Sequence, residues 1–472
     1  MNKTLTQIQE ELKNGTTTVE ALVEAAHETI SERDEDIHAI LGMYSNDLIE
    51  SQIARAKEML AEGTGTMLTG VPIILKDNIV VEGERATAGS KILADYTSVY
   101  DATVVKKLKN AGAILLGRAN MDEFAMGGST ENSAFGPTKN PLDITRVAGG
   151  SSGGSAAVVA YGGVPVSLGS DTGGSIRQPA SFCGIVGLKP TYGAVSRYGL
   201  MAMGSSLDQI GPFANCVDDV ESVFTIIKGA DDLDATSVKN IPEVNSGLKK
   251  KIGVPRSFIE RDGIDAEVLA DFNASLEKLK REGYEIIDVT LPHLEKALSV
   301  YYVVVFAEIS SNMARYDGIR YGLSLKNETM ANSMIGGYFK TRTEGLGDEV
   351  RRRILLGTYV LSSGYYDAYY NKANLVRDML RAEFADAFKE VDAIAMPTSP
   401  IPAFKLGEKH NDPLAMYLAD IFTVPVNIVG VPAISLPSGK TKEGLPLSLQ
   451  IIAPHFGEST LFTIGRDFEK VY

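Results

Sequence analysis

Short runs that are apolar at nearly every position are the feature of this sequence that most restricts its fold. They occur at residues 71–75, 113–116 and 164–168, between stretches with helical periodicity, and strand-like runs return at 393–396, 433–436 and 447–452. A strand without polar alternation is buried on both faces, so helices must cover both sides of the sheet that it joins. The sequence therefore predicts an α/β protein whose sheet carries helices on both faces.

The first 65 residues predict a helical layer outside this sheet. Apolar residues recur at helical spacing from Leu5 onwards, and Gly15 marks the end of that helix. Residues 17–20 (TTVE) predict a capping box at the start of a second helix. A third amphipathic stretch begins near residue 46 and ends at Gly63. Residues 1–65 are therefore expected to be helical throughout.

The composition excludes several classes of function. A net charge of −14 argues against a chain that holds a nucleic-acid backbone by itself, because phosphate binding needs clustered Lys and Arg. The two cysteines, Cys183 and Cys216, belong to no CxxC or Cys/His cluster, so neither a disulfide framework nor a metal site is predicted. No run reaches the length of a membrane span, and the opening residues lack the apolar region of a signal peptide. We therefore expect a reduced, cytoplasmic enzyme or subunit.

A lysine ends the first apolar run, in the segment VPIILKDN at residues 71–78. A partly desolvated ammonium loses its preference for charge, so its pKa falls and it can act as a base. The alternative is that Lys76 only extends its amine from a strand end into solvent, which is the more common case for a lysine in isolation. Lys76 is a candidate base that needs support from other segments.

The segment AGGSSGGSAA at residues 148–157 places serines among glycines before a helical apolar run. Glycines let backbone amides turn toward a small polar group, and a helix start adds its dipole. The segment contains the G-x-S-x-G pattern of α/β-hydrolases, but that fold needs a preceding strand and a later His, and the later histidines lie in no suggestive setting. A phosphate-binding loop is excluded because no Gly-Lys-Ser/Thr follows. Taken alone, the segment is a weak signal, since such stretches are usually flexible loops.

The segment SLGSDTGGSIRQP at residues 167–179 joins an apolar run to a short helix through a Gly-Gly turn. The turn exposes Ser175 beside successive backbone N–H groups. Such donors, those of Thr172, Gly173 and Gly174, suit the oxyanion of an acyl-transfer intermediate. The alternative is an ordinary strand-to-helix turn.

Together, the three segments supply what a serine nucleophile needs. A serine hydroxyl reacts poorly without a base, and none of the five histidines lies near these segments. Lysine is a recognised alternative base. The set predicts acyl-transfer chemistry in which Ser175 is the nucleophile, Ser151 is a bridging hydroxyl and Lys76 is the base.

These three segments resemble the signature of the amidase signature family, whose members use a Ser-Ser-Lys triad. Lys76 matches the family lysine of VPIxxKDN, Ser151 matches the first serine of GGSSGGS, and Ser175 matches the nucleophile of DTGGSIRxPA. In the family, the residue that matches Ser151 sits on a cis peptide bond. Two departures, Ala148 where proline is common and Gly128 where serine is frequent, touch no triad position.

The resemblance covers nearly the whole chain and implies one amidase-signature domain, residues 1–472, with a large mixed β-sheet core. Within it, residues 1–65 form the N-terminal helical layer and residues 66–220 the signature core that carries the triad. Residues 221–472 supply the remaining sheet and helices with the substrate pocket. No internal repeat or low-complexity linker marks a domain boundary.

Segments such as NMDEFAMG (residues 120–127) and DPLAMYLAD (residues 412–420) resemble one branch of the family. That branch comprises glutamine-hydrolysing subunits of tRNA-dependent amidotransferases. The resemblance implies that this chain releases ammonia from glutamine and passes it to a partner subunit, which amidates Glu on mischarged tRNA(Gln) or Asp on tRNA(Asn).

Glutamine as substrate sets two electrostatic requirements. Its α-carboxylate calls for a guanidinium and its α-ammonium for a carboxylate. By similarity, these roles fall on Arg353 and Asp420, and the backbone of Ala125, Met126 and Gly127 lines the same pocket. The alternatives are a solvated helix face for Arg353, which is one of three consecutive arginines, and a helix-end carboxylate for Asp420.

An acidic chain without an ATP site cannot complete a transamidation alone. We therefore expect two partners, a subunit that binds tRNA and ATP and a small bridging subunit, with tRNA reached only indirectly and no membrane involved. No cofactor is expected in this chain, and ATP and Mg act through the partner. Two rival readings are a stand-alone amidase for small amides, which would share the triad and differ in its pocket, and a catalytically silent scaffold, which would be expected to lack a triad residue.

Overall fold

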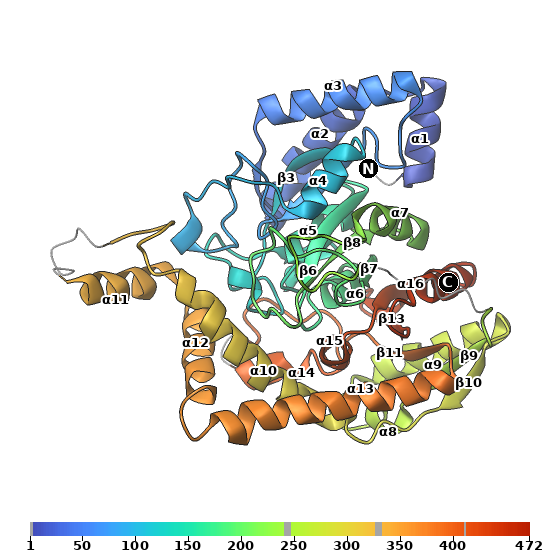
Figure 1. Ribbon diagram of the computed structural model, residues 1–472. Helices are drawn as coiled ribbons and strands as arrows, with labels where there is room; N and C mark the ends of the chain where they lie inside the picture. Colours follow the sequence, from blue (N-terminus) through green and yellow to red (C-terminus); the bar gives the residue numbers. More distant parts are fainter. Residues whose placement is uncertain (1–2, 240–246, 326–332, 410–411) are drawn as a thin grey trace.

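The computed structural model describes residues 3–239, 247–325, 333–409 and 412–472. Within these residues the chain forms a large mixed sheet, a two-stranded sheet and sixteen α-helices (Figure 1). The strands are β1 (Ile40–Met43), β2 (Pro72–Lys76), β3 (Ile114–Ala119), β4 (Lys139–Asn140), β5 (Asp143–Val147), β6 (Val166–Asp171), β7 (Val186–Lys189), β8 (Gln209–Ala214), β9 (Lys251–Val254), β10 (Glu285–Asp288), β11 (Ala393–Pro397), β12 (Ala433–Lys440) and β13 (Pro446–Ile452).

The helices are α1 (Leu5–Asn14), α2 (Val19–Ile37), α3 (Asn46–Glu62), α4 (Thr103–Asn110), α5 (Gly153–Ala160), α6 (Arg177–Cys183), α7 (Val217–Ile227), α8 (Arg256–Ile259), α9 (Ala266–Arg281), α10 (Ala297–Asn312), α11 (Met334–Gly345), α12 (Asp348–Val360), α13 (Lys372–Glu390), α14 (Pro413–Leu418), α15 (Val424–Val429) and α16 (Glu458–Glu469). Short 3₁₀ turns are η1 (Lys91–Leu93), η2 (Glu123–Ala125), η3 (Leu294–Lys296) and η4 (Met313–Arg315), and η5 (Tyr366–Asn371) is a π-helical turn.

The large sheet has eleven strands in the order β1-β3-β2-β6-β8-β7-β12-β13-β11-β9-β10. β2 runs parallel to both β3 and β6, and β9 runs parallel to β10 and β11, whereas the other neighbours are antiparallel. The predicted α/β fold with a large mixed sheet is therefore confirmed. β6 lies where the pairing changes from parallel to antiparallel, because β8 on its other side runs in the opposite direction.

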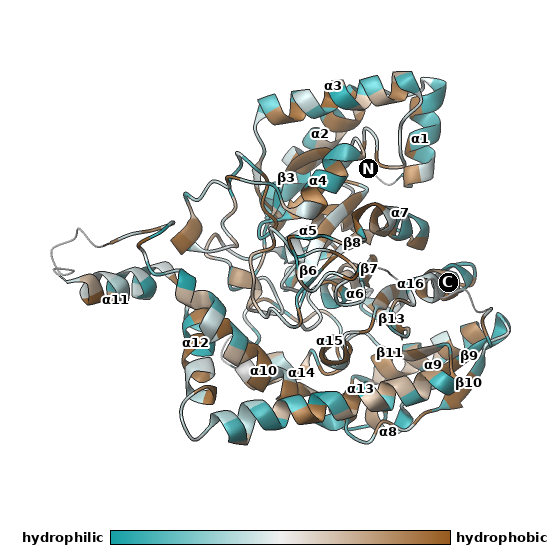
Figure 2. Cartoon of the chain, in the orientation of Figure 1, coloured by the Kyte–Doolittle hydropathy of each residue, from teal (hydrophilic) through white to brown (hydrophobic). Residues whose placement is uncertain are grey.

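Alternate residues of β2 enter two separate hydrophobic cores. Ile73 and Leu75 join the core that contains α4, α7, α9 and α10, whereas Ile74 joins the core that contains α2, α3, α5 and α6. Both faces of the sheet are therefore covered by helices, as the unalternated apolar runs predict. In Figure 2 the outer helices α1 and α3 carry much hydrophilic teal, as helices exposed on one side do.

The N-terminal helices follow the predicted boundaries with one difference in capping. α1 ends at Gly15, whose φ of 74° is the left-handed conformation favoured by glycine. The N-cap of α2 is Thr18, whose hydroxyl oxygen accepts the N–H of Ala21 at 3.1 Å. The predicted capping box between Thr17 and Glu20 is therefore wrong by one residue.

The N-terminal layer is also not purely helical. β1 interrupts it between α2 and α3 and joins the edge of the large sheet, where Ile40 pairs with Ala119 of β3. The expectation of helices throughout residues 1–65 is wrong at this strand, because the four-residue run is too short for a periodicity argument to detect.

Helices α10 to α13 follow one another between residues 297 and 390, and α11 lies at the end of an arm in Figure 1. Within the described residues, one helical segment, Leu294–Arg315, is long and apolar enough to cross a membrane by length and composition, with a mean hydropathy of 1.3. Of the apolar stretch of this segment, 56% is buried inside the protein, where α10 packs against α12, α13 and α15. The expectation that no run reaches this length is therefore wrong, because a helix that is apolar on all sides also suits a protein interior.

Candidate active site

Two neighbouring parallel strands bring the candidate lysine and the nucleophile loop to one edge of the sheet. Leu75 of β2 pairs with Leu168 of β6, so Lys76 and Ser170 lie just beyond this pair, toward the carboxyl ends of their strands. Binding sites of α/β sheets form outside the carboxyl ends of the strands, at places where the topology changes. The site therefore lies where the sheet changes from parallel to antiparallel.

The amine of Lys76 is fully buried and surrounded by three oxygens. Its Nζ lies 2.8 Å from Ser151 Oγ, 3.0 Å from Ser170 Oγ and 3.2 Å from the Ser170 carbonyl oxygen. Burial lowers the pKa of Lys76 to about 7, although the carboxylates of Asp122 and Asp171 act to raise it. A neutral amine beside Ser151 is therefore available near neutral pH, as a base requires.

Ser151 lies in the buried Gly/Ser loop that leads into α5, and the Gly150–Ser151 peptide bond is cis. The loop packs too closely for larger residues. A Cβ on Gly150 would lie 2.2 Å from Asp122 Oδ2 and 2.6 Å from the backbone N of Ser129. The glycines of this motif therefore allow close packing of backbone against backbone, and the segment is not a flexible loop.

Ser175 lies in the turn between β6 and α6 and is 7% exposed. Asp171 holds the turn, because its Oδ1 accepts the N–H of Gly174 at 2.9 Å. The Gly174 N–H therefore already has a partner in this structure, and its role as an oxyanion donor stays a prediction. The N–H groups of Thr172 and Gly173 donate no hydrogen bond within the described part of the chain, so they are the predicted donors that stay open.

Lys76 and Ser151 are in contact, whereas Ser151 and Ser175 form no hydrogen bond within the described ranges. The nucleophile turn itself is tightly enclosed. A Cβ on Gly173 would lie 2.6 Å from Tyr301 Oη, and a Cβ on Gly174, whose φ is +144°, would lie 2.3 Å from Thr423 Oγ1. Both glycines are therefore required by space, and Gly174 also by its backbone conformation.

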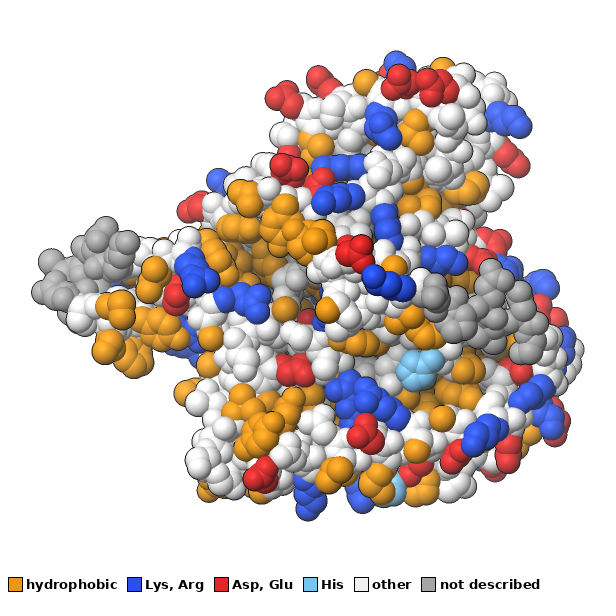
Figure 3. All heavy atoms as spheres, viewed as in Figure 1, with side chains coloured by type: hydrophobic (Ala, Val, Ile, Leu, Met, Phe, Trp, Pro, Cys, Tyr) orange, Lys and Arg blue, Asp and Glu red, His pale blue; other side chains and the backbone are white. Residues whose placement is uncertain are grey.

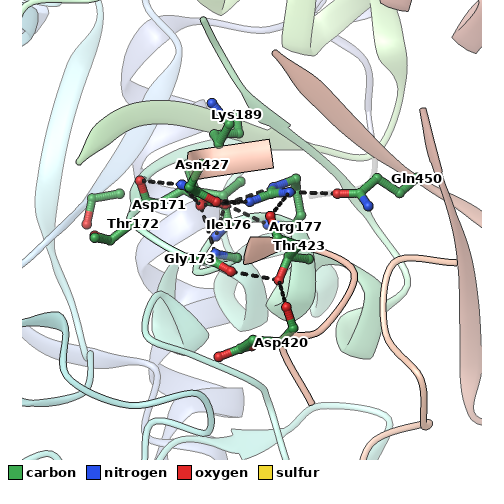
Figure 4. Close-up of polar contacts among 12 residues, drawn as sticks. Asp171, Thr172, Gly173, Ile176, Arg177, Lys189, Asp420, Thr423, Asn427 and Gln450 are labelled. Atoms are coloured by element: carbon green, nitrogen blue, oxygen red, sulfur yellow. Dashed lines mark hydrogen bonds and ion pairs between the residues drawn. The ribbon is translucent and has the colours of Figure 1, made fainter. Parts of the chain in front are cut away.

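A buried ion pair that the sequence does not predict lies next to Gly173 and Ile176 of the nucleophile turn (Figure 4). Arg177 Nη2 lies 3.0 Å from Asp171 Oδ1, and both side chains are fully buried. Arg177 also donates to Asn427 Oδ1 at 2.5 Å and to Gln450 Oε1 at 2.6 Å. Burial acts to raise the pKa of Asp171, but the Arg177 guanidinium outweighs it and holds this pKa at about 2. The pair fixes the carboxylate that in turn holds the Gly174 N–H.

A cavity of about 220 Å³ lies beside this site. It is lined by Gly127, Ser129, Glu131, Asn132, Asp348, Glu349, Arg352, Arg353, Lys409, Met416 and Tyr417. The cavity brings together two of the predicted substrate residues, Gly127 and Arg353. Ala125, Met126 and Asp420 do not line it, although Met126 lies in the same loop and accepts the Asn132 side-chain N–H at 3.1 Å.

Arg353 is buried, with 5% exposure, so the alternative of a solvated helix face is excluded. Its Nε donates to Glu349 Oε1 at 2.7 Å, and its guanidinium lies 5.8 Å from the ring centroids of both Phe306 and Tyr417. Burial acts to lower the pKa of Arg353, but Glu349 and the neighbouring tyrosines together outweigh it and raise this pKa. The terminal nitrogens Nη1 and Nη2 donate no hydrogen bond within the described residues, which leaves a fork for a carboxylate.

Asp420 is half-buried and lies next to the nucleophile turn. Thr423 Oγ1 lies 3.1 Å from the Asp420 carbonyl oxygen and 2.7 Å from the Gly173 carbonyl oxygen (Figure 4). Burial raises the pKa of Asp420 to about 7, although Arg353 acts to lower it. Thr423 thus joins the candidate ammonium-binding residue to the turn that carries Ser175.

The model of the amidase family matches residues 21–462. The chain belongs to the amidase family. It is 52% identical over 459 residues to the A subunit of glutamyl-tRNA(Gln) amidotransferase from Koribacter versatilis, covering 96% of this chain and 95% of that protein. It is 50% identical to the protein of the same name from Caldanaerobacter subterraneus, over 99% of this chain and 96% of that protein. The crystal structure of the corresponding protein from Thermotoga maritima, which bears the same name, matches with a TM-score of 0.79 and 44% identity, covering 96% of this chain and 91% of that chain.

In this amidase the arrangement combines a buried amine, a hydroxyl in contact with it, a second serine in a strand-to-helix turn and open backbone N–H groups. Such groups can carry out acyl transfer from an amide. In the described part of the chain, no group of three or more His, Cys, Asp or Glu side chains could hold a metal ion.

Proposed function

We propose that this amidase is the glutamine-hydrolysing subunit of a glutamyl-tRNA(Gln) amidotransferase. The relatives of that name, 52% and 50% identical over nearly the whole chain, support this assignment. The observation that carries the chemistry is the contact of 2.8 Å between the buried Lys76 amine and Ser151. The Lys76 pKa of about 7 allows this amine to be neutral, and thus basic, at physiological pH.

The first half of the reaction forms an acyl-enzyme. Ser151 gives its proton to Lys76 while it takes the proton of Ser175, and Ser175 Oγ bonds to the side-chain amide carbon of glutamine. The electron pair of the C=O bond moves to oxygen, and this oxyanion accepts the open N–H groups of Thr172 and Gly173. The proton returns through Ser151 to the leaving nitrogen, the C–N bond breaks, and ammonia leaves.

The second half regenerates the serine. Water gives a proton to the same relay and attacks the γ-glutamyl ester on Ser175. The ester C–O bond breaks, Ser175 Oγ recovers a proton, and glutamate leaves. Lys76 and Ser151 therefore act twice, first to activate Ser175 and then to activate water.

Glutamine is held by its α-substituents at the cavity next to the turn. The open Nη1 and Nη2 of Arg353 bind the α-carboxylate in two parallel hydrogen bonds. Asp420, next to the turn, accepts from the α-ammonium, and Gly127 supplies a backbone wall to the cavity, with Ala125 and Met126 directly before it in the same loop. Glu349 fixes the Arg353 guanidinium through Nε and leaves the fork free.

The ammonia serves a partner subunit that binds tRNA and ATP with Mg, and a small subunit bridges the two. This chain binds no cofactor of its own in the proposed complex. The partner chooses between Glu on tRNA(Gln) and Asp on tRNA(Asn).

The test is ammonia release from glutamine by the purified chain, first alone and then with its co-expressed subunits, ATP and mischarged tRNA. We expect weak release alone, a sharp rise in the assembly, and none with Ser175→Ala. Normal glutamine kinetics in Ser175→Ala would overturn the triad. Turnover of unrelated small amides by the lone chain, unaffected by partners, would instead identify a stand-alone amidase.

A further inference from the structure

The loop that lines the substrate cavity and the loop that carries Ser151 are joined by one buried amide. Gln178 lies in the first turn of α6 and is fully buried. Its Oε1 accepts the N–H of Gly150 at 2.9 Å, and its Nε2 donates to the carbonyl oxygen of Gly128 at 2.7 Å. Gly150 precedes Ser151, and Gly128 follows Gly127 of the cavity wall.

The amide of Gln178 fills the gap between these loops. A Cβ on Gly149 would lie 2.5 Å from Gln178 Oε1 and 2.7 Å from the Cα of Pro179. On the cavity side, a Cβ on Gly128 would lie 3.8 Å from Gln178 Nε2 and 3.9 Å from Asp420 Oδ2. The length of the side chain and its two hydrogen bonds therefore set the distance between the cavity wall and the peptide that carries Ser151.

A second connection holds the same two loops further along. Thr130 Oγ1 donates to the Gly149 carbonyl oxygen at 2.8 Å and accepts the N–H of Gly153 at 3.1 Å. Asp122 accepts the N–H of Thr130 at 2.9 Å and donates its own N–H to the Ser151 carbonyl oxygen at 3.2 Å. Gln178 differs from these residues because it extends from α6, the helix that begins two residues after Ser175. It therefore ties three parts of the site together.

We propose that Gln178 is a positioning residue that keeps Ser151 in register with both the substrate cavity and the nucleophile turn. The proposal rests on the proposed function. A substrate that contacts residues 127–129 shifts the Gly150 peptide through the Gln178 amide. Substrate binding and the proton relay therefore change together. This role requires a donor and an acceptor at once, because one loop offers a carbonyl and the other an N–H.

Gln178→Glu tests this requirement with a side chain of the same shape. A protonated carboxyl can still accept from Gly150 and donate to Gly128, whereas the ionised form cannot donate and repels the Gly128 carbonyl oxygen. Burial favours the protonated form, so the variant changes its hydrogen bonding within the range where activity can be measured. The full-length chain and the variant are assayed for glutamine kcat and KM from about pH 5.5 to about pH 8.5, with ammonia release as the readout.

We expect the ratio of variant kcat to wild-type kcat to lie near one at the acidic end and to fall about tenfold or more as the introduced carboxyl ionises. A ratio that is constant across this range overturns the proposal. Taking the ratio at each pH removes the titration of Lys76, which both proteins share.

Gln178→Met removes both hydrogen bonds while keeping the length of the side chain, and it serves if the glutamate variant does not fold. We expect kcat to fall about 10- to 100-fold with a change in KM at every pH. The matched control is Gln52→Met, because buried Gln52 also bonds a backbone N–H and a backbone carbonyl, both of Leu115, away from the relay. Equal kcat losses in the two methionine variants, or none in Gln178→Met, would overturn the positioning role.

Ser175→Ala separates this inference from the proposed function. If that variant still hydrolyses glutamine, the triad assignment fails whatever Gln178 does. If it is inactive and the Gln178→Glu ratio is flat, only the coupling fails.

Discussion

The signature core (residues 66–220) and the lobe formed by α11, α12 and α13 differ in how far their side chains are buried. Every residue from 161 to 183 is buried, and polar side chains there such as Asp171, Arg177 and Gln178 hydrogen-bond to other buried side chains or to the backbone. In the lobe, large apolar side chains are open to solvent, including Met334 at 77%, Leu355 at 71% and Leu375 at 67%. In Figure 3 hydrophobic side chains gather over α11.

This difference separates two tasks. Groups that perform chemistry need fixed distances, and a closely packed core supplies them. Arg353 lies at the boundary, on the face of α12 that packs toward α10, while Leu355 two residues later points outward. Substitutions are therefore expected to lose severity from the core, through this boundary, to the lobe surface.

Lys76→Met should show the largest effect. The variant keeps the length of the side chain but has no base, so we expect kcat to fall about 10⁴-fold or more. Lost hydrogen bonds and relief from burying an amine oppose each other, so stability should change little. Ammonia release and urea unfolding measure the two quantities. A kcat within about tenfold of wild type would show that catalysis does not depend on the Lys76 amine.

Arg177→Met comes next, since it leaves Asp171 buried without its partner. We expect a loss of about 3–5 kcal/mol in the free energy of unfolding. The control is Arg256→Met, because the Arg256–Asp288 pair at 2.7 Å joins a half-buried arginine to an exposed carboxylate and should contribute about 1 kcal/mol or less. Urea titrations of both variants give the comparison, and similar losses would remove the contrast between core and surface.

Arg353→Lys probes the boundary. Lysine keeps the charge but loses the fork, so KM for glutamine should rise about 10- to 100-fold while kcat changes less. Arg351→Lys, on the exposed side of the same helix, should leave both parameters unchanged. A kcat loss larger than the KM rise would place Arg353 in the chemistry and not in binding.

The pH dependences of kcat and KM should report separately on Lys76 in the core and on Asp420 at the boundary. Lys76 acts when neutral, so kcat should rise about tenfold per pH unit up to its pKa of about 7 and then level off. Asp420 binds an ammonium when ionised, so KM should fall as pH rises through about 7. In Asp420→Asn the KM should be high and nearly independent of pH below about 8, whereas the rise in kcat should remain. Loss of both dependences in that variant would contradict this division.

Leu355→Gln should have the smallest effect. Its side chain is 71% exposed, so the free energy of unfolding should change by no more than about 0.5 kcal/mol. Val350→Ala on the same helix, where the side chain is fully buried, should lose about 2 kcal/mol. Thermal or urea unfolding measures the loss of stability in each variant. Equal losses would contradict the exposure of the Leu355 side chain in solution.

The sequence predicts best where one local pattern decides the structure. The apolar run that ends at Lys76 carries its own burial signal, and β2 forms there. The sequence does not predict β8 because this strand contains Pro212, which argues against a central strand, yet Pro212 pairs with Leu168 of β6. Its missing N–H is tolerated within a strand that has neighbours on both sides.

The site shows the same limit. Ser151 and Ser175 stand in recognisable glycine motifs, but the Gly174 N–H is taken by Asp171, which no spacing rule indicates. Arg177 lies inside the quoted motif, yet its partners Asn427 and Gln450 come from α15 and β13. Contacts between residues so far apart in the sequence depend on tertiary packing, and one sequence alone does not encode them visibly.

The eleven-stranded sheet ends in two strands of four residues, β1 and β10. A long, flat and apolar edge strand is a template for another chain, and short charged edges prevent that. β10 has Glu285 and Asp288 exposed at its two ends, and β1 pairs with β3 through only a few residues. The outer strands thus protect this wide sheet against edge-to-edge aggregation, which lets the enzyme keep a broad apolar interior at high concentration.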